Sequence, residues 1–567
     1  MSSSLFKIYR EKYNDKIRTI CWGIKMKKLI LTQEISCQYC YKCLRNCPVK
    51  SIMFNRGKSY VIDDECILCG VCIEVCPQRA RTYVRSTHLL DSFKGKPFLV
   101  SIAPSFFAHF DEPFKVITFL KNLGAVAVQE TAVGADIVSH HYKKFIEGRK
   151  KTFITTACPV VFELAEKYYP EVIPYLAPFL SPMNVHAIFM KNYFGDFPVV
   201  YFGPCIAKKR DGEDYVDLAM TYEELSSYIE RSNVNIEELE ESFPTPPYPQ
   251  RGRVYPVSGG INSTLEGSWE NYLVVEGVEN IIRVFENISS YGEGFVIEAS
   301  SCFGGCINGP AIRKDIGILE KRRRILSYME KLREVEGESI KPQLIDLDIK
   351  RNFSSQKKII EIPEERIRKV LREMGKDNPK KELNCGACGY PTCRDKAIAV
   401  ILGKAEKEMC ITYLIDKVSS VSNAIIEEFP NIVIIYKNGK PIYLNPAGED
   451  FFYNKEALLD FVIEEIDSGK NPLEISIDGD EYYFFVKTFN LPDDNGKVAL
   501  LLDITNEKKR EDELNKLKKE SAEKIEELIN RQMLLAQEIA SLLGESIAET
   551  KSQFAQFRKV LEEDANL

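Results

Sequence analysis

The sequence lacks several features, and each absence excludes a class of protein. No apolar run in its 567 residues reaches the roughly 18 to 20 residues that a membrane span needs, and its N-terminus lacks the apolar core of a signal peptide. It has no excess of positive charge, because 76 Lys and Arg residues face 83 Asp and Glu residues, for a net charge of −7. We therefore expect a cytoplasmic protein with no membrane span and no nucleic-acid partner.

Histidine is also scarce, whereas cysteine is abundant and clustered. None of the 5 His residues has metal-ligand spacing with another, but 17 Cys residues are present. Eight of them lie within 37–76, four within 158–306 and four within 385–410, and Cys21 is left over. Clustered cysteines in a reducing compartment usually bind metal. At roughly 100 to 200 residues per domain, the length predicts about three to five domains.

The first eight cysteines form two sets of four, and the second set repeats the first at a constant offset of 29 residues. Each set has the spacing Cys-x2-Cys-x2-Cys-x3-Cys-Pro, in which three thiolates hold one 4Fe-4S cluster and the fourth crosses to the other cluster. The sequence therefore predicts two sites: cysteine site 1, formed by Cys37, Cys40, Cys43 and Cys76, and cysteine site 2, formed by Cys66, Cys69, Cys72 and Cys47. Two tetrahedral zinc sites are the alternative, but zinc does not require a crossed fourth ligand. The spacing resembles that of two-cluster bacterial ferredoxins.

Four further cysteines lie in three short motifs. The motifs TTACP (155–159), GPCIAK (203–208) and EASSCFGGC (298–306) follow the ferredoxin-like segment in this order. Together they resemble the three signature motifs of the iron-only (FeFe) hydrogenases. The resemblance implies an H-cluster: cysteine site 3, formed by Cys158, Cys205, Cys302 and Cys306, would bind a 4Fe-4S cube, and Cys306 would also bridge to a diiron unit that carries CO, cyanide and a dithiolate. Clusters at sites 1 and 2 would transfer electrons to and from the H-cluster.

The resemblance also implies which residues surround the diiron unit. Lys208 would donate to one cyanide, because an ammonium group is a strong donor to an anionic ligand. The segment Ala103-Pro104-Ser105 would line the other cyanide, and Pro204 and Ser300 would also contact the cofactor. Without the motif, Lys208 would be interpreted as a solvated residue of the basic run Lys208-Lys209-Arg210.

The last two ligands of site 3 have a spacing of their own. Cys302 and Cys306 stand at i and i+4, the separation of side chains on one face of a helix. We therefore expect the two thiols to share a helix face, with Gly304 and Gly305 leaving room for a bulky cofactor.

The chain departs from fast members of the family at the positions that relay protons. Those members have a cysteine where this chain has Ala157, and two glutamates where ungapped counting gives Tyr142 and Phe145. Gly203 and Ser300 replace two methionines that pack on the diiron unit. Because losing general acid–base transfer typically costs roughly 10² to 10⁴ in rate, we predict slow turnover with H2 binding retained.

A different proton route is the alternative to slow turnover. Hydroxyl and imidazole groups relay protons, and Tyr142, Ser300 or the pair His140 and His141 could supply such a route.

The last cluster of cysteines lies in the C-terminal third of the chain. Cys385, Cys388, Cys393 and Cys410, called cysteine site 4, have the spacing Cys-x2-Cys-x4-Cys-x16-Cys. This spacing is similar to that of small 4Fe-4S modules in electron-transfer complexes. A tetrahedral zinc site is the alternative, since four cysteines in two groups also suit zinc.

Beyond site 4 the pattern changes to apolar strands joined by turn dipeptides. The dipeptides are Asn438-Gly439, Asp478-Gly479 and Asn495-Gly496. Such dipeptides favour two-residue hairpins, so residues 418 to 505 are predicted to form a small antiparallel sheet. With Asn445-Pro446-Ala447-Gly448 after its first hairpin and Asp503-Ile504-Thr505 at its exit, this segment resembles a PAS domain.

The final segment is highly charged and is predicted to form one long helix. Its apolar seam is formed by Leu514, Leu517, Ile525, Leu528, Leu535, Ile539 and Leu542. The seam steps by 11 residues and then by 7, which is a stutter in a helical repeat. A lone amphipathic helix is the alternative, but we expect the seam to pair with a second chain.

Together these patterns predict a multidomain protein of α/β and α+β class. The expected parts are an N-terminal tail (1–30), a two-cluster 4Fe-4S ferredoxin domain (31–88), an H-cluster domain (89–335), a helical linker (336–380), a four-cysteine 4Fe-4S domain (381–416), a PAS domain (417–505) and a signalling helix or coiled coil (506–567). Translation could start at Met1 or at Met26.

The preferred hypothesis is a sensory FeFe-hydrogenase that binds H2, turns it over slowly and reports through its C-terminal segments. Its partners would be H2, a second copy of the chain through the PAS domain and coiled coil, and an unknown regulator (a kinase or a phosphatase) or electron carrier. The chain has no recognisable histidine-kinase core, Gly-rich nucleotide loop or DNA-binding motif, so any output must lie in a partner. A metabolic, ferredoxin-linked FeFe-hydrogenase is one alternative. The other is a hydrogenase-like Fe-S scaffold without the diiron subsite.

Overall fold

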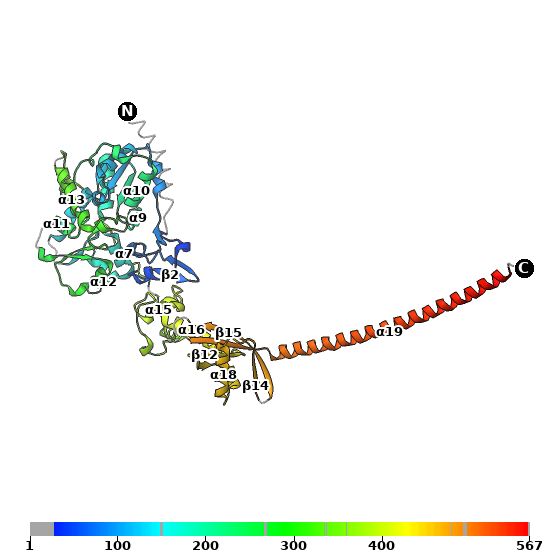
Figure 1. The fold of residues 1–567 in the computed structure, drawn as a ribbon. Helices are drawn as coiled ribbons and strands as arrows, with labels where there is room; N and C mark the ends of the chain where they lie inside the picture. The colour runs from blue at the N-terminus through cyan, green and yellow to red at the C-terminus, as the bar shows by residue number, and fades with distance from the viewer. Residues whose placement is uncertain are drawn as a thin grey trace. The chain divides into compact units, whose positions relative to one another are not determined.

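The computed structural model describes residues 28–147, 151–265, 269–333, 335, 337–358, 360–477, 479–491 and 496–564. The chain divides into two compact units, Met1–Leu414 and Ile415–Leu567, which Figure 1 traces by colour. Most of the tail expected at 1–30, with Cys21 and Met26, lies outside the described residues. Within the described ranges, no helix is long and apolar enough to cross a membrane.

The N-terminal cysteine-rich segment folds as two copies of one backbone motif. Its elements are β1 (Ile30–Thr32), α2 (Lys42–Arg45), β2 (Ile52–Asn55), β3 (Lys58–Val61), α3 (Val71–Glu74) and β4 (Arg81–Tyr83). Strand β1 pairs antiparallel with β4, and β2 pairs antiparallel with β3. The backbone angle φ is positive at Tyr39 and Leu68, and again at Lys50 and Arg79. Each pair is separated by the offset of the cysteines, so the sequence repeat is also a repeat of the backbone.

The central segment contains two parallel sheets, so its α/β class is confirmed. One sheet has the order β6-β5-β8-β9 and the other the order β10-β11-β7. The strands are β5 (Phe98–Ile102), β6 (Ala125–Glu130), β7 (Phe153–Ile154), β8 (Val199–Gly203), β9 (Leu218–Thr221), β10 (Tyr272–Glu276) and β11 (Val296–Ser300). Strand β8 lies where the apolar run 198–202 predicts a strand. All five residues of β5 and all five of β8 are buried, as expected for strands covered on both faces.

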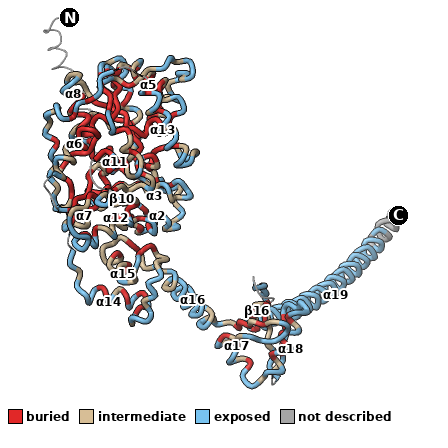
Figure 2. Tube along the Cα trace, turned by 90° about the vertical axis from the view of Figure 1, so that its left-hand side faces the viewer, coloured by how far each residue is buried: buried red, intermediate tan, exposed pale blue. Residues whose placement is uncertain are grey.

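Helices surround these sheets. They are α4 (Phe106–His109), α5 (Pro113–Asn122), α6 (Ala132–Ile146), α7 (Pro159–Tyr168), α8 (Pro182–Phe194), α9 (Lys208–Asp211), α10 (Tyr222–Arg231), α11 (Gly260–Thr264), α12 (Val278–Glu286) and α13 (Ile318–Arg333). One apolar core surrounds the four-stranded sheet. A second core joins the three-stranded sheet to the ferredoxin-like segment, so both form one folded body, whose buried trace is red in Figure 2.

The segment expected to be a helical linker belongs in part to the four-cysteine module. Between 336 and 380 the described residues form one α-helix, α14 (Glu364–Glu373). Ile367 and Leu371 of this helix pack on Ala397 of α15 (Cys393–Ile401). Helix α14 is amphipathic, and burial of its apolar face on α15 makes it part of that small core.

The second unit contains the antiparallel sheet that the turn dipeptides predict. Its elements are α16 (Ile411–Glu427), which begins in the first unit, then β12 (Ile432–Lys437), β13 (Lys440–Leu444), α17 (Pro446–Phe451), α18 (Glu456–Asp467), β14 (Leu473–Ile477), β15 (Asp480–Asn490), β16 (Gly496–Asp503) and α19 (Thr505–Asp564). The sheet order is β13-β12-β16-β15-β14, and every pairing is antiparallel. Asn438-Gly439 forms the β12–β13 turn, and part of the other two predicted turns lies outside the described residues.

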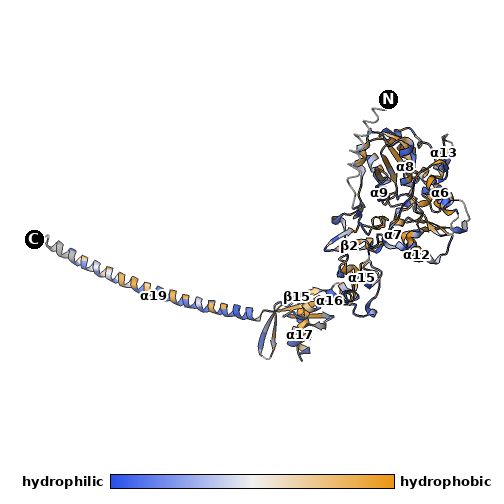
Figure 3. Ribbon diagram, turned by 180° about the vertical axis from the view of Figure 1, so that it is seen from behind, coloured by the Kyte–Doolittle hydropathy of each residue, from blue (hydrophilic) through white to orange (hydrophobic). Residues whose placement is uncertain are grey.

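Helix α19 is exposed along almost its whole length, as the pale blue tube of Figure 2 shows. Orange apolar and blue polar residues alternate along it in Figure 3. The single long helix expected for the final segment is therefore present.

Candidate active site

One cavity, of about 110 Å³, gathers the residues of the three motifs. Its walls include Ala103, Pro104, Ser105, Ala157, Cys158, Pro204, Cys205, Lys208, Ser300, Cys302 and Cys306. Each of these was singled out from the sequence, although they are spread over more than a third of the chain. The structure therefore brings the predicted cofactor-binding residues of site 3 together.

The cavity lies where parallel strands end. The loop after β5 supplies 103–105, the loop after β8 supplies 204–205, and the segment after β7 supplies 157–158. The last residue of β11 and the loop after it supply 300–302. Parallel strands bring their carboxyl ends to the same edge of a sheet, which is the usual place for a ligand site in α/β proteins. The topology thus explains how motifs remote in sequence meet.

The four thiols of site 3 lie close enough to influence one another's ionisation. Burial, together with the charge of Cys158, raises the pKa of Cys205 to about 11 and that of Cys306 to about 12. Burial, followed by the neighbouring thiols, also raises the pKa of Cys302. Such thiols ionise only when a cation stabilises the thiolate. Four soft ligands around one apolar cavity therefore fit an iron–sulfur cube.

The expectation that Cys302 and Cys306 share a helix face is wrong. Cys302 lies just after β11, and Cys306 begins a short 3-10 turn, Cys306–Asn308. Between them Gly304 and Gly305 adopt φ values of 80° and 84°, in the left-handed region that favours glycine. A Cβ atom on Gly305 would lie 2.5 Å from the backbone oxygen of Pro256. The glycines reverse the chain against that neighbouring segment, so they do not merely leave space.

Lys208 is held in the cavity wall and is not solvated. Its Nζ donates to Asp211 Oδ2 at 2.9 Å and to the backbone oxygen of Ala157 at 3.1 Å. The buried carboxylate of Asp211 also accepts from Ser181 Oγ at 2.6 Å and from Arg351 at 2.8 Å. Burial raises the pKa of Asp211, but the charges of Lys208 and Arg351 outweigh it and lower that pKa below its usual value. An ionised Asp211 therefore orients the ammonium group of Lys208.

Apolar rings surround the positions that we expect to correspond to the proton relay of the family, Tyr142 and Phe145. Tyr142 is buried, and its ring centroid lies 5.7 Å from that of Phe179 and 6.1 Å from that of Phe153. Phe145 lies 5.5 Å from each of the same two rings. The Tyr142 hydroxyl accepts a hydrogen bond from the backbone N–H of Thr156 at 3.0 Å. Ala157 and this aromatic cluster, formed by Tyr142, Phe145, Phe153 and Phe179, offer one hydroxyl and no carboxylate.

Several other residues of the cavity wall were given no role from the sequence, and Tyr201 and Glu298 are two of them. Tyr201 occupies the space next to Gly203, because a Cβ atom there would overlap its ring. Glu298 accepts a hydrogen bond from the backbone N–H of Asn262 at 2.8 Å, and burial raises its pKa to about 7. Glu298 is the first residue of the third motif. Its place in the motif, before Cys302, could have identified it from the sequence as a cavity residue.

In the ferredoxin-like segment, the fourth cysteine of each set lies near the cysteines of the other set. Cys47 lines a small cavity together with the other members of site 2: Cys66, Cys69 and Cys72. Burial raises the pKa of Cys69, and the charge of Cys47 raises it further. Burial likewise raises the pKa of Cys43, which also feels the charge of Cys76. The fourth cysteine of each set thus lies beside the other set.

Site 2 lies against the loops of site 3. A Cβ atom on Gly70 would lie 2.5 Å from Pro310 Cβ and 3.6 Å from Ile206 Cδ1. Gly70 follows the site 2 ligand Cys69, and Ile206 follows the site 3 ligand Cys205. The ferredoxin-like segment therefore contacts the cavity wall through site 2.

Site 4 packs against the ferredoxin-like segment on another side. Burial raises the pKa of Cys388, and the charges of Cys410 and Cys385 raise it further. A buried lysine, Lys396, feels the charges of Cys388 and Cys410, and burial lowers its pKa to about 8. Arg45 donates to the backbone oxygen of Ala387 at 3.3 Å.

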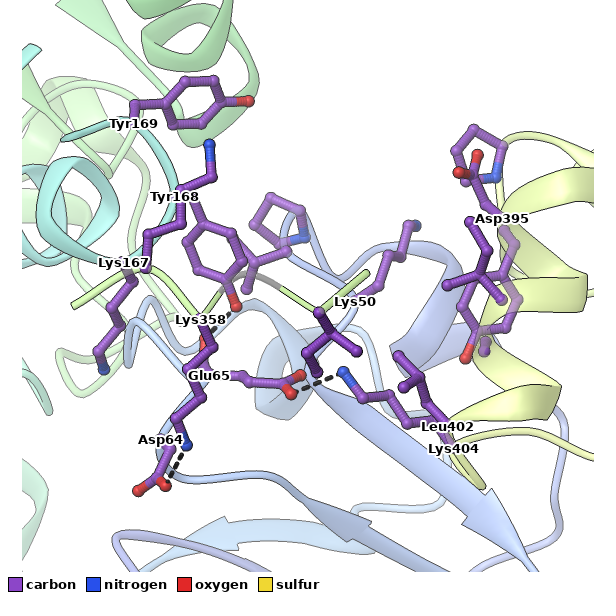
Figure 4. Close-up of a pocket in the computed structure, with 18 of the residues that line it drawn as sticks. Lys50, Asp64, Glu65, Lys167, Tyr168, Tyr169, Lys358, Asp395, Leu402 and Lys404 are labelled. Carbon is purple, nitrogen blue, oxygen red and sulfur yellow. Dashed lines mark hydrogen bonds and ion pairs between the residues drawn. The ribbon is translucent and has the colours of Figure 1, made fainter. Parts of the chain in front are cut away.

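A cavity of about 490 Å³ lies between site 2 and site 4 (Figure 4). Ion pairs cross it from Lys404 to Glu65 at 2.6 Å and from Lys358 to Asp64 at 2.8 Å. Lys50 extends into it and donates to the backbone oxygens of Leu44 at 3.1 Å and Arg45 at 2.8 Å. Burial lowers the pKa of Lys50, whereas the charges of Cys47 and Cys388 raise it. Lys50 therefore feels the thiols of both sites.

Comparison with known protein families agrees with this arrangement. Residues 96–310 match the iron only hydrogenase large subunit, C-terminal domain, and residues 29–77 match a 4Fe-4S dicluster domain. Residues 382–412 match a family described as a putative Fe-S cluster. The chain thus carries the C-terminal domain of an FeFe-hydrogenase large subunit, together with iron–sulfur domains.

Curated relatives named as hydrogenases are similar to the chain at low identity. The NADP-reducing hydrogenase subunit HndD of Solidesulfovibrio fructosivorans is 23% identical over 414 residues, which are 56% of this chain and 71% of that protein. Iron hydrogenase 1 of Clostridium pasteurianum is 23% identical over 372 residues, which are 45% of this chain and 65% of that protein.

Two solved structures show weaker similarity. The FeFe-hydrogenase HydA1 from Chlamydomonas reinhardtii is 15% identical, covers 48% of this chain and 99% of its own, and has a TM-score of 0.36. The PAS domain of the HTR-like protein from Haloarcula marismortui is 16% identical, covers 16% of this chain and 95% of its own, and has a TM-score of 0.13. These TM-scores support no functional conclusion.

Proposed function

We propose that this protein is an H2-sensing FeFe-hydrogenase that binds H2 and turns it over slowly at an H-cluster. One observation carries the proposal. The cavity that gathers the four thiols of site 3 and Lys208 has an alanine at the first proton-relay position, and an aromatic cluster occupies the next ones. The site is thus suited to hold the cofactor and poorly suited to supply protons.

When bound, the H-cluster would supply the reversible conversion of H2 into two protons and two electrons. The protein's own residues hold and shield it. Cys158, Cys205, Cys302 and Cys306 would provide its thiolate ligands, and Lys208, oriented by Asp211, would donate to an anionic ligand. The methyl group of Ala157 can neither donate nor accept a proton, so transfer must wait for water or for the Tyr142 hydroxyl.

The output is proposed to pass through the C-terminal unit. The antiparallel sheet, with α17 and α18 between β13 and β14 in the chain, supports a PAS domain. The exposed apolar seam of α19, with Leu528 at 61% and Leu535 at 52% exposure, supports pairing with a second copy. An unknown kinase, phosphatase or electron carrier would read the signal.

The infrared spectrum of anaerobically matured protein tests the proposal. Spectra in the CO and cyanide stretching region are recorded under argon and then under H2. Intrinsic bands that shift with H2 are expected. Absence of bands after verified maturation would overturn the proposal in favour of the scaffold without a diiron subsite, and iron and sulfide counts would show which sites carry clusters.

Turnover and regulation separate the sensor from the metabolic enzyme. The sensor is expected to evolve H2 far more slowly than ordinary catalytic hydrogenases, because general acid–base transfer is worth roughly 10² to 10⁴ in rate. Deleting 418–567 should leave H2 chemistry intact and abolish H2-dependent regulation. Fast turnover, or regulation unchanged by the deletion, would contradict the sensory role.

A further inference from the structure

Arg81 is a buried cation whose hydrogen-bond partners are two hydroxyl groups and one thiol. It is the first residue of β4 and is 3% exposed. Its Nη1 donates to Thr32 Oγ1, and its Nη2 donates to Ser59 Oγ. Among the residues that the structure describes, no carboxylate forms an ion pair with Arg81. Burying a charge is costly unless an opposite charge lies close to it, so the two hydroxyl groups alone do not balance this guanidinium.

The thiol partner of Arg81 is a ligand predicted for site 1. Arg81 Nη2 donates to Cys43 Sγ at 3.7 Å, and both residues are buried. Burial raises the pKa of Cys43, and Arg81 opposes this rise by its charge and by its hydrogen bond. An iron–sulfur cube held by four thiolates is an anion, and hydrogen bonds from a cation to such a group are strong. The guanidinium therefore fits a site whose bound group carries negative charge.

The internal repeat provides a comparison within the same chain. Ile52 lies 29 residues before Arg81, and it begins β2 as Arg81 begins β4. Ile52 is fully buried and lines the small cavity of site 2 together with Cys47 and Cys66. The same position of the repeat thus carries an alkyl side chain beside site 2 and a guanidinium beside site 1. The backbone motif does not require an arginine here, since isoleucine occupies its other copy.

The hydrogen bonds to sulfur also differ between the two sites. At site 2, Ser51 Oγ lies 3.6 Å from Cys47 Sγ, so the partner of that sulfur is a neutral hydroxyl. A charge-assisted hydrogen bond is roughly twice as strong as a neutral one. The charge of Arg81 also reaches site 2, because it lowers the pKa of Cys72, which burial and the thiols of site 2 raise. We therefore expect Arg81 to act on both sites and to act more strongly on site 1.

We propose that Arg81 raises the reduction potential of the iron–sulfur group at site 1 through its hydrogen bond to Cys43. Reduction adds one electron to an anionic group, and a cation bonded to a ligand sulfur stabilises the added charge. The inference goes beyond the proposed function, because it rests on the iron–sulfur group at site 1 and not on H2 sensing. A higher potential at site 1 favours a one-electron transfer in which the group at site 2 is oxidised and the group at site 1 is reduced. Since site 2 contacts the wall of the site 3 cavity, this transfer moves the electron away from that cavity.

A redox titration of the full-length protein, followed by electron paramagnetic resonance, tests the proposal. Cys40→Ser and Cys69→Ser identify the signals of sites 1 and 2, because each removes one predicted ligand of one site. At a fixed potential, Arg81→Gln is expected to lower the ratio of reduced to oxidised site 1 at least tenfold, which corresponds to about 59 mV for one electron. Arg79→Gln is the matched control, because it removes the same charge from an exposed position two residues away. It should change the ratio less than twofold.

The outcomes separate this inference from the presence of the iron–sulfur group itself. Arg81→Lys keeps the charge and should recover more than half of the shift that Arg81→Gln causes. An unchanged ratio at site 1 in Arg81→Gln, equal shifts at sites 1 and 2, or an equal effect of Arg79→Gln would overturn the inference. An unsubstituted protein that shows no signal sensitive to Cys40→Ser would overturn the group at site 1 together with the inference.

A measurement on the unsubstituted protein keeps the inference testable if the Arg81 variants do not fold. Arginine with isotopically labelled guanidinium nitrogens is incorporated, and the reduced protein is examined by pulsed electron paramagnetic resonance. A coupling to the labelled nitrogen is expected in the signal of site 1, because the donor atom lies 3.7 Å from a ligand sulfur. Absence of this coupling would show that the guanidinium does not bond to the group, and it would overturn the inference.

Discussion

Lys208 and Asp211 form a hydrogen-bonded ion pair in the wall of the site 3 cavity, with 2.9 Å between Nζ and Oδ2. The Asp211 side chain has 0% exposure, and Lys208 has 11%. Arg351 reaches the other carboxylate oxygen at 2.8 Å. One carboxylate thus balances two cations, and the pair fixes the only lysine that lines this cavity among the described residues.

Asp211→Asn should therefore destabilise the protein. The amide would leave the charges of Lys208 and Arg351 without a counter-charge in a buried site, which typically costs about 3 to 5 kcal/mol. Anaerobic thermal unfolding should show a clearly lower midpoint temperature. Asp64→Asn is the control, because Asp64 pairs with Lys358 at an exposed position, with exposures of 74% and 65%. A surface pair of this kind is worth about 0 to 1 kcal/mol, so equal effects would show that Asp211 has no special role.

Ala157→Cys should increase the rate of H2 evolution. The thiol would restore the last proton-transfer group beside the cofactor, next to the Tyr142–Thr156 hydrogen bond. We expect a gain of about tenfold, below the full range of roughly 10² to 10⁴ for general acid–base transfer, because Phe145 still interrupts the relay. The assay is H2 evolution with a chemical reductant at matched iron content. Ala157→Ser, of similar size, is the control for cavity shape, and a rate unchanged by the thiol would mean that protons arrive by another route.

His109 should make stability depend on pH in the mildly acidic range. Burial lowers the pKa of His109 to about 4, and its Nδ1 accepts from the backbone N–H of Arg313 at 3.0 Å. The unfolded chain binds this proton near pH 6.5, so between pH 6.5 and 4 the unfolded state binds more protons and stability falls as the pH falls. The difference between a pKa of 6.5 in the unfolded chain and about 4 in the folded chain corresponds to a loss of about 3 kcal/mol of folding stability across this window.

The midpoint temperature at pH 5 and pH 7 measures this effect. His109→Gln should reduce the difference between the two pH values, whereas His88→Gln, at an exposed position, should leave it unchanged. Part of the difference should remain, because burial also lowers the pKa of His186 to about 3. An unaltered pH dependence in His109→Gln would assign the acid sensitivity to other groups.

The grouping of the cysteines was predictable because the spacing of the Cys residues can be seen in the sequence, and their role as cluster ligands stays a prediction. The 29-residue repeat indicated the crossing of Cys47 and Cys76, and the structure places these cysteines beside the opposite sets. The partners of Lys208 were not predictable in the same way. Asp211 is three residues away, but Ser181 and Arg351 come from distant segments, and only tertiary packing brings them together.

The loop of the third motif shows why a spacing rule can fail. A separation of four residues indicates a shared helix face only if the backbone between is helical. Gly304 and Gly305 take left-handed φ values, so the prediction for Cys302 and Cys306 was wrong. The aromatic cluster was also hidden, since Phe153 and Phe179 meet Tyr142 only through the fold.

Lys50→Met should alter the reduction potentials of the iron–sulfur groups proposed for sites 2 and 4. The charges of Cys47 and Cys388 both raise the pKa of Lys50, so its ammonium group stabilises negative charge at both cysteines. Its removal should make reduction harder, so the potentials should shift to lower values. Redox titration followed by electron paramagnetic resonance measures the shift. Lys357→Met, at an exposed position of the same cavity, is the control, and equal shifts would show that Lys50 acts only through general charge.

Gly70→Ala should disturb the contact between site 2 and site 3. Gly70 has φ of 82°, and an added Cβ atom would lie 2.5 Å from Pro310 Cβ. Gly57 is the matched control, because its φ is 66° and nothing lies within 4 Å of an added Cβ atom. Both alanines bear the strain of a left-handed backbone, but only the one at position 70 also overlaps a neighbour.

The difference between the two variants therefore isolates the steric contact. Overpacking of a well-packed contact typically costs about 1 to 3 kcal/mol, so Gly70→Ala should unfold at a lower midpoint temperature than Gly57→Ala at the same scan rate. Gly70 begins the turn into α3, which carries the site 2 ligand Cys72, and Pro310 follows the site 3 ligand Cys306 by four residues. Displacing one loop from the other should also change the electron paramagnetic resonance signal of the iron–sulfur group proposed for site 2. The signal of the group proposed for site 4 should stay unchanged. If both alanine variants behaved alike, the Gly70–Pro310 contact would not be what joins the ferredoxin-like segment to the cavity.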